Sequence, residues 1–202
     1  LYETSKPELD LPKIIDVFEM DVNLSYKLLR YSNSPIFRRR AEISTIKQAL
    51  VTLGKVELQK FISVLFSAQM ISDKPPELMA MSLCRAKFAE GLAKASPKVE
   101  SESVAFLTGM MSLIDVIIGE SMESAMEKLP LANEIKDALL KGEGVLAQLI
   151  DIAKNYEQTD WDACEHDLSE LKISQDKVPE IYRKSVHWAN EQMEFVLSGE
   201  AT

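Results

Sequence analysis

Histidine and cysteine are both scarce in this chain of 202 residues, which holds 2 of each. His166 and His187 are too few for a histidine-rich metal centre, and Cys84 and Cys164 are too far apart for a metal-binding or redox motif. A G-x-S-x-G nucleophile motif and a lysine-bearing phosphate loop are also missing. The commonest metal, nucleophilic and phosphate sites are therefore excluded. We expect two reduced thiols, no bound metal and no cofactor.

Long apolar runs are missing as well. No stretch approaches the roughly 18 consecutive apolar residues that a membrane-spanning helix requires. The opening residues, LYETSKPELD, have neither the basic start nor the apolar centre of a signal peptide, and they do not begin with Met. We therefore expect a cytoplasmic protein without a membrane span, and a fragment of a longer chain.

Basic charge is in deficit, because 23 Lys and Arg face 32 Asp and Glu and give a formal net charge of -9. Residues 1–72 carry 10 basic against 8 acidic residues, whereas residues 73–202 carry 13 against 24. Nucleic-acid binding requires a basic surface that neutralises phosphates, so this balance argues against a nucleic-acid partner. A local site for an anion or a protein partner remains open in the first third.

The hydrophobic pattern is that of helices almost throughout. Apolar residues recur three or four positions apart, as in Leu11, Ile14, Ile15 and Phe18, and alternating runs rich in Val, Ile and Thr are missing. The sequence predicts an all-α, multi-helix bundle with no sheet. After a first helix near Leu11, further helices are expected near 22–33, 45–53, 56–71, 77–95, 101–118, 121–128, 131–141, 144–156, 160–171 and 176–198. The stretch DKPPE breaks the pattern, and we place a boundary there between residues 1–72 and 73–202.

The most distinctive segment is LLRYSNSPIFRRRAEISTIKQALVTLG, residues 28–54. We expect Asn33 and Pro35 to end one helix, Ser44 to cap the next, and Gly54 to end that one. Four arginines form the candidate interaction surface: Arg30, Arg38, Arg39 and Arg40. Arginine is favoured at protein interfaces and in the recognition of carboxylates and phosphates. The alternatives are a solubilising charged loop and a clamp for a nucleotide phosphate.

The pair His166-Asp167 carries the letters of a metal-binding HD motif. An HD enzyme needs an earlier histidine ligand, and no histidine precedes His166. The apolar stripe of the surrounding helix consists of Trp161, Cys164, Leu168 and Leu171. His166 and Asp167 fall off this stripe, so we expect a solvated surface pair.

Two stretches near the start, MDVNLSYKLLRYSNSPIF and EISTIKQALVTLG, resemble the N-terminal motif of the HDOD family, bacterial signalling domains related to HD phosphohydrolases. The stretches LCRAKFAEGLA, FLTGMMSLIDVIIG and LPLANEIKDALLKGEG resemble the subtype that follows an EAL cyclic-di-GMP phosphodiesterase domain. The resemblance covers nearly the whole chain. It implies that residues 1–72 form a helical part packed on a degenerate HD-like part, 73–202, and that an EAL domain lies upstream.

The resemblance also implies that the metal site of an HD enzyme has been lost. Where that family has G-L-L-H-D-I-G, this chain has GMMSLID, so Ser112 and Leu113 stand in place of the metal-binding His and Asp. Arg85 lies where another histidine ligand is expected, and its charge would repel a cation. We hypothesise that Arg85, Glu90 and Asp115 form a buried ion pair instead of a metal site. The alternative is that Arg85 and Glu90 face water.

These features predict a protein that is not an enzyme and has no catalytic residues. We expect a regulatory, protein-interaction module in bacterial cyclic-di-GMP signalling, whose partner is another protein or the adjoining EAL domain. One alternative is a sensory domain that binds a nucleotide through the arginine-rich loop. A residual HD-type metal phosphohydrolase is a further alternative, disfavoured by the replaced ligands.

Overall fold

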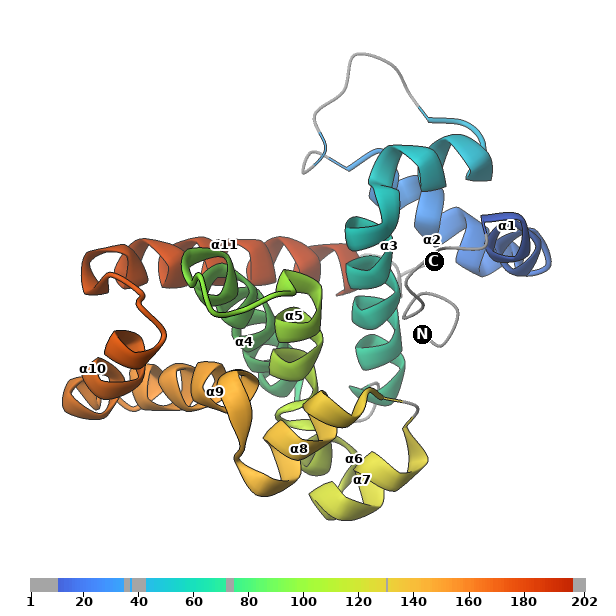
Figure 1. Ribbon diagram of the computed structural model, residues 1–202. Coiled ribbons are helices and arrows are strands. Elements are labelled where there is room, and N and C mark those ends of the chain that lie inside the picture. The colour runs from blue at the N-terminus through green and yellow to red at the C-terminus, as the bar shows by residue number, and fades with distance from the viewer. Residues whose placement is uncertain (1–10, 35–36, 38–42, 72–74, 130, 198–202) are drawn as a thin grey trace. The chain divides into compact units, whose positions relative to one another are not determined.

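Helices dominate the residues that the computed structural model describes, which are 11–34, 37, 43–71, 75–129 and 131–197 (Figure 1). No strand occurs in these ranges, and the predicted all-α fold without a sheet is confirmed. The helices are α1 (Leu11–Glu19), α2 (Val22–Ser32), α3 (Ile46–Ile71), α4 (Pro76–Ala95), α5 (Glu102–Met111), α6 (Ile114–Ile118), α7 (Met122–Lys128), α8 (Asn133–Lys141), α9 (Gly144–Glu157), α10 (Trp161–Glu170) and α11 (Val178–Leu197). None of the described helices is both long and apolar enough to cross a membrane.

The chain divides into two compact units. One comprises residues 1–65 and 195–202, and the other comprises residues 66–194. The division falls inside α3 and again inside α11. The boundary predicted between residues 72 and 73 lies outside the described residues and stays a prediction.

The core of the first unit is built around aromatic rings from α1, α2 and α3. Phe18, Tyr31 and Phe61 are all buried. The ring centroids of Tyr31 and Phe61 lie 4.8 Å apart, and those of Phe18 and Phe61 lie 6.4 Å apart. Such pairs add about 0.5–1.5 kcal/mol to the stability that burial provides. The rings thus anchor α1 and α2 on α3.

The course of α3 is interrupted at Gly54, where the sequence predicts one helix to end. Gly54 has φ 67° and ψ 178°, a conformation that strains any residue with a side chain. The predicted cap at the start of this helix is wrong by one residue. Thr45, rather than Ser44, accepts a hydrogen bond from the Gln48 N–H at 3.2 Å, because α3 begins at Ile46 and the cap bonds three residues ahead.

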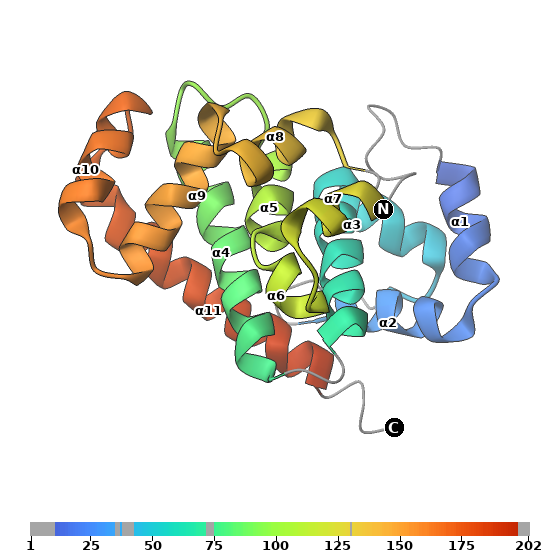
Figure 2. The same ribbon diagram turned by 90° about the horizontal axis from the view of Figure 1, so that it is seen from below.

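Helix α4 is central to the second unit and is flanked by α5 and α9 (Figure 2). It contributes Phe88 and Leu92 to a buried core that includes Leu149 and Ile152 of α9. On α11, the Trp188 ring packs edge-on against Phe106 of α5, with centroids 5.7 Å apart. The core therefore brings helices from both ends of this unit onto α4 and α5.

The helix predicted at 101–118 is interrupted in the structure and forms α5 and α6. Ser112 ends α5 and donates its hydroxyl to the Gly109 carbonyl at 2.7 Å. Leu113 follows with φ -122° and ψ 10°, outside the helical region. A serine hydroxyl that bonds to the backbone competes with helix continuation. The turn places Ser112 at a helix end, where its side chain can be shared with a neighbouring helix.

Candidate functional site

A buried guanidinium joins three helices at the place where the resemblance to HD enzymes puts metal ligands. Arg85 of α4 is 5% exposed. Its Nε and Nη2 donate to the two carboxylate oxygens of Glu157, at 3.1 and 2.6 Å. Its Nη1 donates to the Ser112 hydroxyl at 3.0 Å. Glu157 is the last residue of α9 and Ser112 follows α5, so this Arg85 cluster (Arg85, Ser112 and Glu157) ties α4, α5 and α9 together.

The hypothesis of a buried ion pair is right about Arg85 and wrong about its partners. Glu90 pairs with Lys87 at 2.6 Å, because five positions along α4 turn it away from the face that carries Arg85. Asp115 is not a partner either, because among the described residues the Arg85 guanidinium donates to Glu157 and Ser112. The alternative, that Arg85 and Glu90 face water, is also wrong, since both side chains are buried. Glu157 was missed because it lies 72 residues from Arg85 and no local pattern links them.

The cluster joins helices through non-covalent bonds whose donors and acceptors are paired with one another. The bidentate pair satisfies both carboxylate oxygens of Glu157, and the Ser112 hydroxyl is used twice, once as acceptor and once as donor. A divalent cation at this place would meet the positive charge of Arg85. Leu113, half-buried beside it, offers no ligand atom. The residues present do not fit the metal of an HD enzyme.

A thiol and two phenols border the cluster. Burial, reinforced by the nearby Glu157 carboxylate, raises the pKa of Cys84 to about 11. Burial also raises the pKa of Tyr182, whose hydroxyl is hydrogen-bonded with Cys84, and that of Tyr156. The thiol therefore stays protonated at neutral pH and is a poor nucleophile. Cys84 is therefore a packing residue beside the cluster rather than a reactive thiol.

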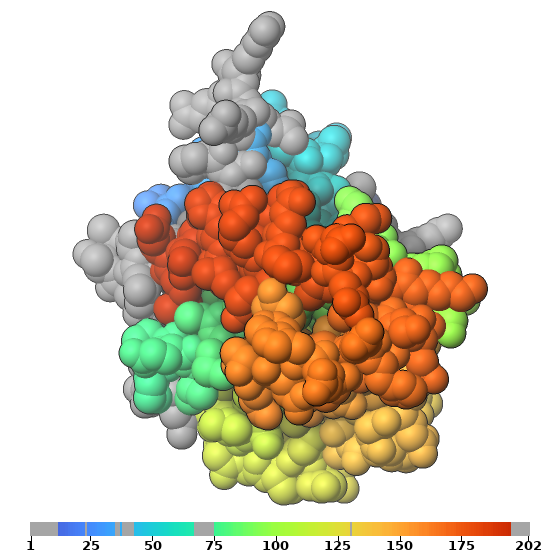
Figure 3. Space-filling model, turned by 90° about the vertical axis from the view of Figure 1, so that its left-hand side faces the viewer, coloured from blue at the N-terminus to red at the C-terminus, as the bar shows by residue number. Residues whose placement is uncertain are grey.

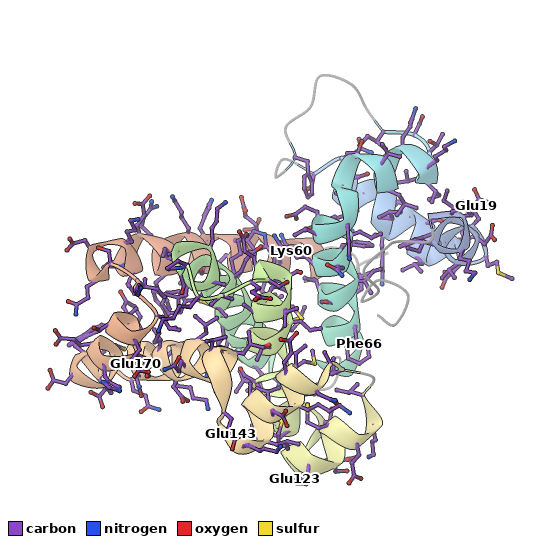
Figure 4. All side chains as sticks on the ribbon, in the orientation of Figure 1. Glu19, Lys60, Phe66, Glu123, Glu143 and Glu170 are labelled. Carbon is purple, nitrogen blue, oxygen red and sulfur yellow. The ribbon has the colours of Figure 1, made fainter. Side chains whose placement is uncertain are left out.

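The His166-Asp167 pair lies on the α9–α10 side of the second unit, where Figure 4 labels the neighbouring Glu170. The His166 side chain is 78% exposed, as the sequence predicts, and its Nε2 lies 4.0 Å from a carboxylate oxygen of Glu170. Asp167 is half-buried, and burial followed by the charge of Asp151 raises the pKa of its carboxyl. Among the described residues, His166, Asp167 and Glu170 form the group whose ligand atoms come within 4.8 Å of one another. Exposed groups of this kind are common without an ion, and no second feature points to one here.

The apolar stripe predicted for α10 is largely correct. Cys164, Leu168 and Leu171 are buried. Trp161 differs, because 55% of it is exposed and its ring stacks edge-on against Tyr156 with centroids 4.9 Å apart. Figure 3 shows the surface to which α9, α10 and α11 contribute in the second unit.

The base of the arginine-rich loop is held by one amide. Asn33 ends α2, as the sequence predicts, with φ -95° and ψ 2°, outside the left-handed region. Its side-chain nitrogen donates to the Leu29 and Ile43 carbonyls at 2.9 and 2.8 Å, and its side-chain oxygen accepts the Ile43 N–H at 2.8 Å. Because Asn33 and Ile43 are ten residues apart, the amide brings the two ends of the intervening loop together.

The arginines themselves are placed only in part. Arg30 is half-buried in the last turn of α2. Pro35 and the run Arg38, Arg39 and Arg40 lie outside the described residues, so the candidate interaction surface stays a prediction. Within the loop, Phe37 packs edge-on against Tyr31 with centroids 5.1 Å apart. The loop is therefore attached to the core of the first unit through Asn33 and Phe37.

Replacing Asn33 by Ala is expected to lower the free energy of unfolding by about 1–2 kcal/mol, because three hydrogen bonds are lost and the Ile43 backbone groups lose their partner. Urea denaturation followed by circular dichroism measures this loss. The matched control is Asn133→Ala at the exposed start of α8, where we expect a loss below about 0.5 kcal/mol. Equal losses in the two variants would contradict the clamping role.

The described part of the chain is all-helical, and the Arg85 cluster joins three of its helices where the resemblance to HD enzymes places metal ligands. The chain belongs to the HDOD family, because the model of the HDOD domain matches residues 1–150. The predicted family is confirmed.

Particular relatives extend the match along the chain. Cyclic di-GMP phosphodiesterase CdgJ of Vibrio cholerae serotype O1 (strain ATCC 39315 / El Tor Inaba N16961) is 35% identical over 189 residues, which are 94% of this chain and 44% of the relative. The uncharacterized protein YuxH of Bacillus subtilis (strain 168) is 32% identical over 200 residues, which are 96% of this chain and 47% of the relative. The chain thus spans less than half the length of these two relatives.

The fold has a counterpart in a crystal structure. A protein from Marinobacter aquaeolei VT8, described as a signal transduction protein, superposes with a TM-score of 0.72 at 14% sequence identity, covering 98% of this chain and 57% of that one. At this identity the likeness concerns the fold alone.

The prediction that the protein is not an enzyme is wrong. It rested on the replacement of HD metal ligands by Ser112 and Leu113. A relative that matches 94% of this chain at 35% identity is named a cyclic di-GMP phosphodiesterase, and this match overturns the prediction. Missing ligands at one site exclude one chemistry at that site, whereas the activity of a protein can reside in any of its sites.

Proposed function

We propose that this chain is a regulatory, protein-interacting segment of a cyclic di-GMP phosphodiesterase. Its similarity to CdgJ over 94% of its length supports a role in the turnover of cyclic di-GMP. Because that match leaves more than half of the relative unaligned, the proposal concerns a protein of the relative's full length. An adjoining EAL domain is the partner proposed for this segment.

The Arg85 cluster is the observation that carries the regulatory part of the proposal. A buried bidentate pair plus a shared serine hydroxyl holds the ends of α5 and α9 against α4. Helices tied in this way move together rather than one at a time, and packed helices respond to a partner by discrete shifts. The segment can thus pass a change at its surface to the rest of the enzyme.

The test is hydrolysis of cyclic di-GMP to the linear dinucleotide by the full-length protein, with Mg²⁺ or Mn²⁺ present. Arg38→Glu, Arg39→Glu and Arg40→Glu together are expected to change kcat/KM at least about fivefold, because reversing charge on a docking surface costs one or more kcal/mol of association. The matched control reverses three exposed lysines of the second unit, Lys94, Lys98 and Lys177, and should stay within about twofold.

Two outcomes would contradict the proposal: one concerns the role in cyclic di-GMP turnover, and the other concerns the arginine surface. A full-length protein without hydrolysis rejects the role in cyclic di-GMP turnover. Hydrolysis that changes equally in the arginine variant and the lysine control rejects the arginine surface while leaving the activity in place.

Nucleotide binding by the same loop is the second candidate function. Its support is that the Asn33 amide bonds to Ile43 on the far side of the segment that carries Arg38, Arg39 and Arg40, since arginines are suited to phosphate recognition. Cyclic di-GMP should then raise the melting temperature of this chain, and the triple arginine variant should abolish the rise. An unchanged melting temperature favours docking of a protein partner.

A further inference from the structure

Two side-chain amides of the chain have opposite surroundings. The Asn33 amide makes three hydrogen bonds at the base of a loop. Gln192, in the last third of α11, is 0% exposed. Among the described residues, neither its side-chain nitrogen nor its side-chain oxygen has a hydrogen-bond partner. A buried amide that has lost water without gaining a partner destabilises the arrangement that buries it.

On the buried face of α11, the residues that precede Gln192 are packed against neighbouring side chains or hydrogen-bonded. Val178 is buried, and the Ser185 hydroxyl donates to the Ile181 carbonyl of its own helix at 2.8 Å. Trp188 packs on Phe106 and lies 5.4 Å from the ammonium group of Lys87. One turn later the same face presents Gln192, where an apolar residue of similar length would continue the packing. The unfavourable burial is therefore confined to the last turns of the helix.

Gln192 lies two residues before the point in α11 where the chain passes from one compact unit to the other. The division between the two compact units falls inside α11, after Glu194. The last turns of α11 are thus one of the places where the chain passes from one unit to the other, and the second such place is inside α3. A helix end that opens easily there changes the local path of the chain at that place.

We propose that Gln192 makes the C-terminal turns of α11 a two-state joint. In the docked state the helix buries its apolar face together with the unpaired amide. In the released state these turns expose Gln192, and water supplies the missing hydrogen bonds. The two states lie close in free energy because the unpaired amide offsets part of the apolar burial. A partner that prefers either state can then shift the population, whichever activity the chain serves.

Hydrogen exchange on the whole chain, followed by mass spectrometry of peptides from residues 186–197, tests the joint. Gln192→Met keeps the length of the side chain and removes the amide. We expect its peptides to exchange about tenfold more slowly than those of the wild type, which corresponds to about 1.4 kcal/mol in the opening equilibrium. The melting temperature should rise as well. Gln192→Leu should change both quantities in the same direction.

Asn190→Leu is the matched control, because Asn190 is an exposed amide on the same helix. It should leave the exchange of residues 186–197 within about twofold of the wild type. The joint is rejected if Gln192→Met exchanges as fast as the wild type or faster, if it melts lower or fails to fold, or if Asn190→Leu slows exchange equally. A lower stability of Gln192→Met would mean that the amide has a native partner.

Discussion

Arg85→Ala is expected to lower the free energy of unfolding by about 3 kcal/mol. Removing one partner of a buried ion pair leaves the other charge unpaired, which costs about 3–5 kcal/mol. The lower end applies here because the Glu157 side chain keeps 21% exposure and can regain some water. Ser112 loses a donor at the same time. Urea denaturation of the wild type and the variant gives the difference.

Two further variants show whether the loss comes from the cluster. Glu90→Ala removes a buried carboxylate of the same helix that bonds to Lys87 instead, so it reports on a different ion pair. The double variant Arg85→Met with Glu157→Leu should recover most of the loss, because it leaves no uncompensated charge. A loss below about 1 kcal/mol in Arg85→Ala would show that the cluster does not hold these helices.

Gly109→Ala is expected to destabilise the second unit by about 2–3 kcal/mol, although alanine is the better helix former by about 1 kcal/mol. A Cβ at Gly109 would lie 2.7 Å from the Arg85 carbonyl oxygen and 2.8 Å from the Ala86 Cα. Both atoms belong to the backbone of α4 and cannot rotate away, so the two helices must separate. That separation also moves the Ser112 hydroxyl away from Arg85.

Gly91→Ala provides the comparison for this prediction. Its Cβ would meet only the Ile181 side chain, with the nearest atom at 2.3 Å, and a side chain can turn aside. We expect a smaller loss than in Gly109→Ala, measured by thermal and urea denaturation of both variants. The reverse order would show that α4 and α5 separate more readily than α11 repacks.

The Arg85 cluster shows how far the sequence could predict the candidate site. The sequence singled out Arg85 and Ser112 through the family resemblance, and the structure joins them at 3.0 Å. It assigned Glu90 and Asp115 as partners because both are charged residues in apolar helices, where a buried charge needs a partner. The actual partner, Glu157, comes from α9, and nothing in a single sequence relates positions 72 residues apart.

The sequence by itself determined what depends on neighbours along the chain: the helical period, the interruption at Gly54, the exposed His166 and the family motif. The tertiary structure decided which distant groups meet: Glu157 with Arg85, and the Asn33 amide with the Ile43 backbone. It also left the Gln192 amide without a partner among the described residues. The reason is physical. Helix formation and capping are governed by groups a few residues apart, whereas the partner of a buried polar group depends on how helices pack, which local pattern does not encode.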